Sequence, residues 1–300
     1  MVEHTVEIEI TNITESENVI NYSIIFLKGI VSCNLCHSPL NGIILVENEN
    51  DSHEFEVSEG NFKFINQLTI GLNQINLLYK FENHSLSKSI QLHRRVNINS
   101  KILKLVYVIP NGDAGHFQSS NSDNSTNSAL KKIIMGAKLI QSLIAERLYE
   151  QGFGRKTFNL FSCDGNEPFC EVHLSSLTKL ELHSLSSEQI WSVTAKELLE
   201  NGCITDSVKV LAFLSCTEYT STAPVTTKKQ YLTALENVKG YVACGKGHLA
   251  MLGSTGLHSW ASEIGEVFRC LTSQDSIDDN LLDDSGFRFV SFKIGFNLKR

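Results

Sequence analysis

Residues 103–109 read Leu-Lys-Leu-Val-Tyr-Val-Ile, and Pro110 ends this nearly continuous apolar run. A run of this kind predicts a strand that is buried on both faces, as in a parallel sheet. Residues 208–214, Val-Lys-Val-Leu-Ala-Phe-Leu, predict a second buried strand. Helical patterns lie between such runs, and strands that alternate with helices indicate an α/β domain with a largely parallel sheet.

Two helices are predicted within this α/β part. After a Ser/Asn/Gly/Asp loop over residues 111–127, apolar residues recur at three- and four-residue steps, which predicts an amphipathic helix. The stripe consists of Leu130, Ile133, Ile134, Ala137, Ile140, Ile144 and Leu148. Gly152 is placed to end this helix. Ser186 and Gln189 have the spacing of a capping box for a second helix that runs to residues 201–202.

Shorter elements complete the α/β part. Residues 157–161, Thr-Phe-Asn-Leu-Phe, predict a strand, and residues 247–253, Gly-His-Leu-Ala-Met-Leu-Gly, predict a short strand between glycines. A last helical face is formed by Trp260, Ile264, Val267 and Phe268.

Residues 1–100 have a different pattern, because apolar and polar residues alternate in short runs that turn signals separate. Residues 6–10, Val-Glu-Ile-Glu-Ile, are one such run, and Glu59-Gly60-Asn61 is one such turn. Short alternating strands at this spacing predict a β-sandwich of immunoglobulin-like type. The chain is therefore expected to be an α+β two-domain protein, with a β-sandwich over residues 1–100 and an α/β domain over residues 101–300.

Composition and charge exclude several classes of protein. The 300 residues are 42% hydrophobic and 20% charged, with a net charge of −7 and a pI near 5.8. The longest tight basic cluster is residues 93–95, too small for a nucleic-acid interface. No apolar stretch reaches the roughly 20 residues that span a bilayer. The N-terminus lacks the pattern of a secretory signal. We therefore expect a cytoplasmic chain with no nucleic-acid or membrane partner and with its 8 cysteines reduced.

The histidines do not form the usual zinc-peptidase motif. That motif, His-Glu-x-x-His on a helix, places two imidazoles on one face and a general base between them. The ten histidines stand at positions 4, 37, 53, 84, 93, 116, 173, 183, 248 and 258, and no two are four residues apart. His53-Glu54 begins like the motif, but Val57 takes the place of the second histidine in a strand-like segment. No catalytic residue and no metal ligand is assigned.

Two other motifs leave alternatives open. Cys33-Asn34-Leu35-Cys36-His37 is compatible with a pair of free thiols in a hairpin, with half of a metal site, or with haem attachment. The acidic run over residues 275–284 is compatible with a solvated loop or with weak calcium binding, because it lacks the spacing of an EF-hand.

Three segments follow one another in an order that is characteristic of one family. The first runs from Leu105–Pro110 through residues 115–117 to the predicted helix. The second is residues 152–158, Gly-Phe-Gly-Arg-Lys-Thr-Phe, and the third is residues 247–254 with Leu-His-Ser-Trp at 257–260. On the first helix the match consists of Lys132, Gly136, Ala137 and Glu146. Together these segments cover roughly the last 200 residues and are similar to a family of proposed zinc metallopeptidases of fungi and animals.

The resemblance implies a zincin-like protease subdomain of strand, helix, strand, strand and edge strand, followed by a helix with His-Glu-x-x-His. In such peptidases the edge strand pairs with an extended substrate, and here that strand would contain Gly247, His248, Leu249, Ala250 and Met251. Zinc is expected for full-length family members. This chain offers no His-Glu-x-x-His, so the subdomain is expected to be incomplete and the chain to bind no zinc cofactor.

Three interpretations remain open. The chain is a truncated form of a peptidase, or it is a non-catalytic module that binds a peptide or protein at residues 247–253, or it is an unrelated α/β domain, since fold alone does not determine function. The substrate and the oligomeric state are not indicated by the sequence.

Overall fold

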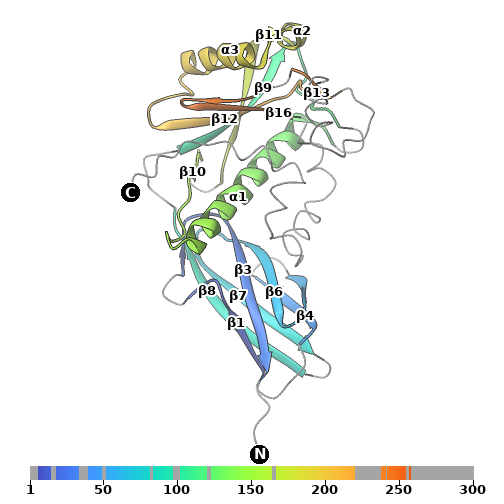
Figure 1. The fold of residues 1–300 in the computed structure, drawn as a ribbon, viewed down its shortest axis with the longest axis vertical. Helices are drawn as coiled ribbons and strands as arrows, with labels where there is room; N and C mark the ends of the chain where they lie inside the picture. The colour runs from blue at the N-terminus through green and yellow to red at the C-terminus, as the bar shows by residue number, and fades with distance from the viewer. Residues whose placement is uncertain are drawn as a thin grey trace, which may run out of the picture. The chain divides into compact units, whose positions relative to one another are not determined.

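The computed structural model describes residues 6–14, 18–33, 40–48, 52–81, 84–96, 102–119, 123–163, 167–219, 238–240, 242–254 and 257. These residues belong to two compact units (Figure 1). Unit 1 contains those within residues 1–98 and 138–157, and unit 2 contains those within residues 99–137 and 158–257. Both units are rich in strands, so the chain has the mixed α and β composition that the sequence predicts.

Unit 1 contains two sheets that are built from the alternating runs of the N-terminal part. The three-stranded sheet has the order β1 (Val6–Ile10), β3 (Ile24–Cys33), β6 (Asn61–Gln67). The five-stranded sheet has the order β2 (Val19–Ile20), β8 (His84–Arg94), β7 (Gly71–Phe81), β4 (Gly42–Glu47), β5 (Ser52–Val57). All neighbours are antiparallel except β2 and β8, which run parallel.

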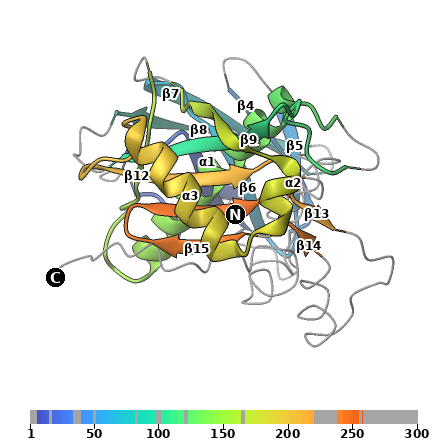
Figure 2. The ribbon, with the colours of Figure 1, turned by 90° about the horizontal axis from the view of Figure 1, so that it is seen from above.

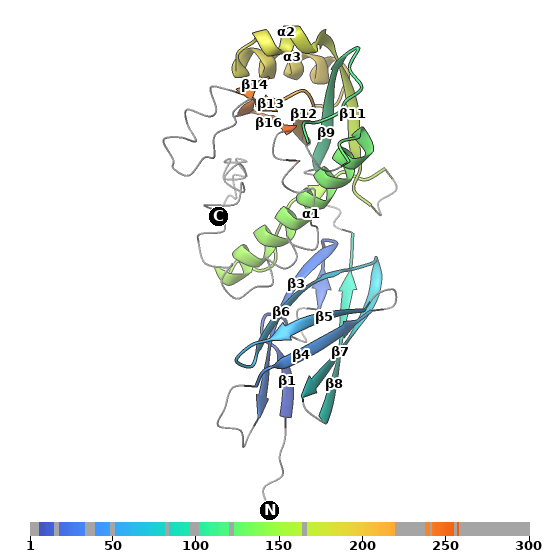
Figure 3. The ribbon, with the colours of Figure 1, turned by 90° about the vertical axis from the view of Figure 1, so that its right-hand side faces the viewer.

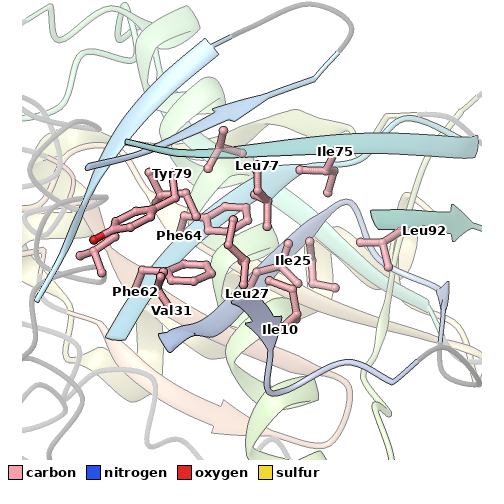
Figure 4. Close-up of a cluster of buried hydrophobic side chains, with 14 of the residues drawn as sticks. Ile10, Ile25, Leu27, Val31, Phe62, Phe64, Ile75, Leu77, Tyr79 and Leu92 are labelled. Carbon is pink, nitrogen blue, oxygen red and sulfur yellow. The ribbon is translucent and has the colours of Figure 1, made fainter. Parts of the chain in front are cut away.

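A single hydrophobic core lies between these two sheets, as Figure 4 shows. Ile25, Leu27 and Val31 of β3 belong to this core and lie on one face of the strand, which follows from its two-residue period. They meet Ile75 and Leu77 of β7 from the opposite sheet. Burying each of these side chains contributes roughly 1.5–3 kcal/mol relative to an exposed position, so the alternation in the sequence is what holds the two sheets together.

The helix α1 (Thr126–Glu150) is the predicted amphipathic helix, and its residues from 138 onwards belong to unit 1. Ala145 of this part is fully buried in the core of unit 1. The helix ends as expected at Gly152, which has a positive φ of 79°. The amide of Gly152 donates to Tyr149 O and that of Phe153 to Leu148 O. This is the pair of bonds of a Schellman motif, in which glycine is favoured because it has no Cβ.

A buried ion pair follows directly from this helix end. Arg155 Nε lies 2.9 Å from Glu146 Oε1, and the two side chains are only 7% and 6% exposed. Asn12 Nδ2 donates to Glu146 Oε2 at 3.1 Å and to Phe26 O at 2.8 Å, while an Arg155 guanidinium nitrogen donates to Asn12 O. Burial and then the Glu146 carboxylate raise the pKa of Tyr22, so its phenol stays neutral beside the pair.

Unit 2 is built on a six-stranded sheet. Its order is β10 (Asn159–Leu160), β9 (Ile102–Asn111), β12 (Val208–Leu214), β16 (Leu249–Gly253), β15 (Ala243–Lys246), and β11 (Cys170–Thr178) also pairs with β9. The short strands β13 (Glu218–Tyr219) and β14 (Val238–Lys239) form a separate antiparallel pair. In the six-stranded sheet every pair is parallel except β15 with β16, as the buried runs of the sequence predict.

Helices cover both faces of this sheet (Figure 3). One face packs against α2 (Lys179–Ser184) and α3 (Ser187–Glu200), and Val106 and Val108 of β9 point to that side. The first half of α1 packs on the other face, against Leu105 and Tyr107. The nearly continuous apolar character of β9 is explained by this position, because the strand has bonded strands on both sides and helices on both faces.

Some of the helix and strand bounds predicted from the sequence agree with the structure, and others do not. The capping box at Ser186 and Gln189 is present and α3 follows it, and β12 has the predicted bounds. The strand predicted at residues 157–161 is reduced to β10, while β11 and α2 were not predicted. The helical face at residues 260–268 lies outside the described residues. No helix in the described part of the chain is long and apolar enough to cross a membrane.

The buried ion pair makes a specific prediction about stability. Arg155→Ala leaves the Glu146 carboxylate buried without a counter-charge, and we expect it to lower the free energy of unfolding of unit 1 by about 3–5 kcal/mol. Hydrogen exchange of the β3 amides in increasing urea measures this loss. The control is Arg147→Ala, which removes a pair whose side chains are 45% and 35% exposed and should cost less than about 1 kcal/mol. Equal losses in the two variants would contradict the prediction.

Candidate functional site

The outer strand of the unit 2 sheet is β15, not the segment that the sequence analysis proposed. Residues 247–253 were expected to form the edge strand, but β16 is paired on both sides, with β12 and with β15. The reason is Gly247, whose φ of 57° allows a tight turn with His248. This turn folds residues 243–246 back along the outer side of β16, and the candidate peptide-binding edge therefore moves to β15.

The hairpin geometry indicates which backbone groups of β15 are available. Lys246 pairs with Leu249 across the two-residue turn. The residues that flank such a turn form a hydrogen-bonded pair, and bonded and non-bonded pairs then alternate along an antiparallel ladder. The backbone groups of Lys246 and Cys244 therefore bond to β16. Those of Gly245 and Ala243 point outwards, away from β16. Among the described residues no strand pairs with this outer side.

The helix α3 fixes the position of the β15–β16 hairpin, and Figure 2 shows α3 crossing these strands. Trp191 Nε1 donates to Leu249 O at 3.2 Å. Lys246 Nζ lies 5.8 Å from the centre of the Trp191 ring and 3.3 Å from Glu188 Oε1. The exposed ion pair contributes little by itself, but the indole bond and the buried Leu249 and Met251 hold the hairpin on the helix.

The five residues proposed for substrate binding have different surroundings. Gly247 and His248 form the turn, and the carbonyl of His248 accepts a bond from Val210 N at 2.7 Å. Leu249 and Met251 are buried, at 3% and 0% exposure, in the core under α3. Ala250 is half-buried on the opposite face of the sheet. They support the outer strand, and contact of these residues with a substrate stays a prediction.

The zinc that the resemblance implies has no fitting donor set in the part of the chain that the structure describes. No group of three or more His, Cys, Asp or Glu side chains is placed there to hold a metal ion. Cys33 is half-buried at the end of β3, while Cys36, His37 and the acidic run over 275–284 lie outside the described residues.

A buried polar cluster joins β11 to α3. His173 Nε2 lies 3.0 Å from Glu197 Oε2, and Ser175 Oγ donates to Glu197 Oε1 at 3.2 Å. Ser176 donates to the same oxygen through its amide at 2.9 Å. Burial would raise the pKa of Glu197, but the bonds from Ser176 and His173 outweigh it and hold this pKa below its usual value.

This cluster does not have the geometry of a catalytic triad. In a triad the nucleophile is bonded to the histidine, and the histidine is bonded to the acid. Here both Ser175 and His173 are bonded to Glu197, so no base faces a serine hydroxyl. The cluster therefore anchors β11 on α3, and we assign it no chemical step.

A second polar group lies on the same face, where Lys104 forms an ion pair with Glu171. Cys203 Sγ donates to Glu171 Oε1 at 3.3 Å. Burial and then the bond to Glu171 raise the pKa of Cys203. Nucleophilic cysteines have a lowered pKa, so this thiol is a poor nucleophile. Burial likewise raises the pKa of Cys170 and of Cys216 to about 12.

The strand β11 was not predicted from the sequence, although a signal for it exists. Residues 170–174, Cys-Glu-Val-His-Leu, alternate apolar and polar, and the structure turns Glu171 and His173 towards α3. Alternation of this kind is typical of a half-exposed strand. Reading it as such would have placed one more strand between α1 and α3.

The comparisons with known proteins bear mainly on the family. No curated protein matches this chain. A solved structure with detectable similarity is the endo-β-1,4-mannanase from Thermotoga petrophila, which is 14% identical, with a TM-score of 0.25. The similar region covers 32% of this chain and only 21% of the mannanase. A likeness of this size carries no argument about fold or function.

One family model matches almost the whole chain. It is described as the "Putative peptidase family", and the match extends over residues 7–293. It therefore includes β1 at the start of unit 1, the whole of the unit 2 sheet and the β15–β16 hairpin. The chain belongs to this peptidase family.

Proposed function

We propose that unit 2 is a peptide-recognition subdomain of zincin-like plan, in which an extended peptide pairs with the outer side of β15. The observation that carries the proposal is the position of β15, the one antiparallel strand and the margin of an otherwise parallel sheet. Membership of a peptidase family supports a peptide as the ligand. The resemblance implies the order strand, helix, strand, strand, edge strand, and β9, α1, β11, β12 and β15 follow one another in this order, with α2 and α3 between β11 and β12.

Strand addition is the chemistry that this margin offers. A peptide would exchange main-chain hydrogen bonds with Ala243 and Gly245, each contributing about 0.5–1.5 kcal/mol. The small side chains of these two residues allow a close approach of the peptide backbone. Lys246, whose side chain is 57% exposed, adds a positive charge at the turn end of the strand.

We propose further that these 300 residues bind peptides without hydrolysing them. The support is the lack of a His-Glu-x-x-His sequence and of a metal donor set among the described residues. Family members that carry the motif would use zinc as their cofactor. The alternative function for the present chain is peptide hydrolysis by residues outside that motif. A hydrolysis assay separates the two candidates.

For residues 1–100 we propose an immunoglobulin-like sandwich that forms its own domain. The division of its strands into β1-β3-β6 and β8-β7-β4, with further strands at the margins, supports this likeness. Every described sheet takes its strands from one side of residue 100, which supports a domain boundary there.

We also propose a cytoplasmic location, which the thiol state of Cys163, Cys170, Cys203, Cys216 and Cys244 supports, because a reducing compartment keeps cysteines out of disulfides. Non-reducing electrophoresis after alkylation tests it, since disulfides in the extracted chain would contradict it.

The domain boundary predicts the course of limited proteolysis. We expect the first cut near Asn99 and Ser100, because linkers between domains have few contacts that protect them. Mass spectrometry of early fragments identifies the site. Early cuts inside the strands of residues 24–33 or 71–81 would contradict a separate sandwich domain.

Peptide binding can be tested with a proline at the outer edge. Ala243→Pro removes an outward N–H at the first residue of β15, a position where proline is tolerated in edge strands. We expect the affinity for peptides selected from a mixed library to fall about tenfold, whereas the control Ala243→Ser, which keeps the N–H, retains it. Fluorescence anisotropy measures both variants. Unchanged binding by the proline variant would place the peptide elsewhere.

Metal content and hydrolysis form the last test of the proposed function. We expect a chain with Cys33→Ser and Cys36→Ser to retain less than one zinc per molecule, because a stable site needs three or four placed ligands. Atomic absorption after dialysis measures the metal. Chelator-sensitive cleavage of the peptide library by the pure chain would show that it is an active peptidase.

A further inference from the structure

The second margin of the unit 2 sheet is formed by β11. This strand pairs in parallel with β9 along residues 170–174, and a bulge follows before Thr178. In the part of the chain that the structure describes, no strand pairs with the other side of β11. Its outward N–H and C=O groups are therefore open to pairing, as those of any uncovered edge strand are.

Between residues 170 and 174 the exposed side chains of β11 are apolar. Val172 is 39% and Leu174 is 70% exposed, and both lie on the face opposite to His173. Natural edge strands are usually protected against pairing by proline, lysine or outward charges. Here the charged side chain of Glu171 is bound to Lys104, and His173 is bound to Glu197. The margin thus has neither a proline nor an outward charge between residues 170 and 174.

We propose that β11 pairs with β11 of a second copy of this chain, antiparallel about a two-fold axis at Val172, so that the two sheets become continuous. In this register Val172 lies opposite its own counterpart, and Leu174 lies opposite Cys170 of the second copy. Glu171 lies opposite the second copy's His173, twice by symmetry. Apolar residues then share one face, and unlike polar groups share the other.

The neighbouring registers are less favourable, and this selects the axis. A two-fold axis at Glu171 would place two carboxylates directly opposite each other, which is destabilising. An axis at His173 would place two imidazoles together and leave Glu171 opposite Ser175. Among axes at residues 171 to 173, in the middle of the regular stretch 170–174, only the axis at Val172 combines an apolar pair at the centre with unlike polar partners on both sides. This complementarity indicates a second copy as the partner.

Sedimentation velocity tests the dimer. The wild-type chain of 33.4 kDa should sediment as a species of twice this mass at about 100 µM, well above micromolar dissociation constants. Leu174→Lys should raise the dissociation constant about tenfold or more, since it places a charge on the pairing edge. The control Leu180→Lys, at a position 82% exposed on α2, should leave it unchanged. A monomeric wild type, or a dimer that Leu174→Lys does not weaken, overturns the proposal.

A disulfide trap tests the register. Directly opposite residues in an antiparallel pair have Cα atoms about 4.5–5.5 Å apart, within the range that a disulfide bridges. Val172→Cys, in a Cys163→Ser background that removes an exposed thiol, should form a covalent dimer in mild oxidant, while the background alone should not. Circular dichroism confirms that both variants are folded. Failure of folded Val172→Cys to cross-link above background overturns the proposal.

Discussion

The structure of unit 2 depends on β9 being bonded on both sides. Its partners are β12 on one side and β10 and β11 on the other, so the central strand is paired along both of its sides. A strand in this position exposes neither face, because α3 covers one and α1 the other. This constraint requires apolar residues at consecutive positions, and it places the two strands with open edges, β11 and β15, at the opposite margins of the sheet.

The buried pair of Glu146 and Arg155 has a corresponding role in unit 1. Both residues belong to the segments by which the sequence resembles the peptidase family, and neither is near the β15 margin in the chain. The glycine that ends α1 turns the chain back, so that Arg155 reaches Glu146.

The elements that were predicted correctly are those whose sequence pattern is compatible with one kind of secondary structure only. The run at 103–109, the run at 208–214 and the capping box at Ser186 each correspond to one element. The β15 margin was misplaced because Gly247 was read as the start of a strand, although its positive φ makes it a turn. The local sequence pattern cannot show whether Gly247 begins an edge strand or forms a turn. The answer depends on whether another strand pairs with the outer side of β16, as β15 does here. The clusters around Glu171 and Glu197 join residues more than 20 positions apart, and spacing alone does not reveal them.

The amide of Asn12 has a consequence for the covalent chemistry of the chain. Asn12-Ile13-Thr14 is an acceptor sequence for N-linked glycans, which are attached to the side-chain nitrogen. Both hydrogens of Asn12 Nδ2 are already donated, one to Phe26 O and one to Glu146, and the residue is 8% exposed. A sugar at this position would remove a donor from the buried carboxylate and would have no space in the interior. The folded unit 1 is thus incompatible with glycosylation at this sequence, whatever compartment the chain passes through.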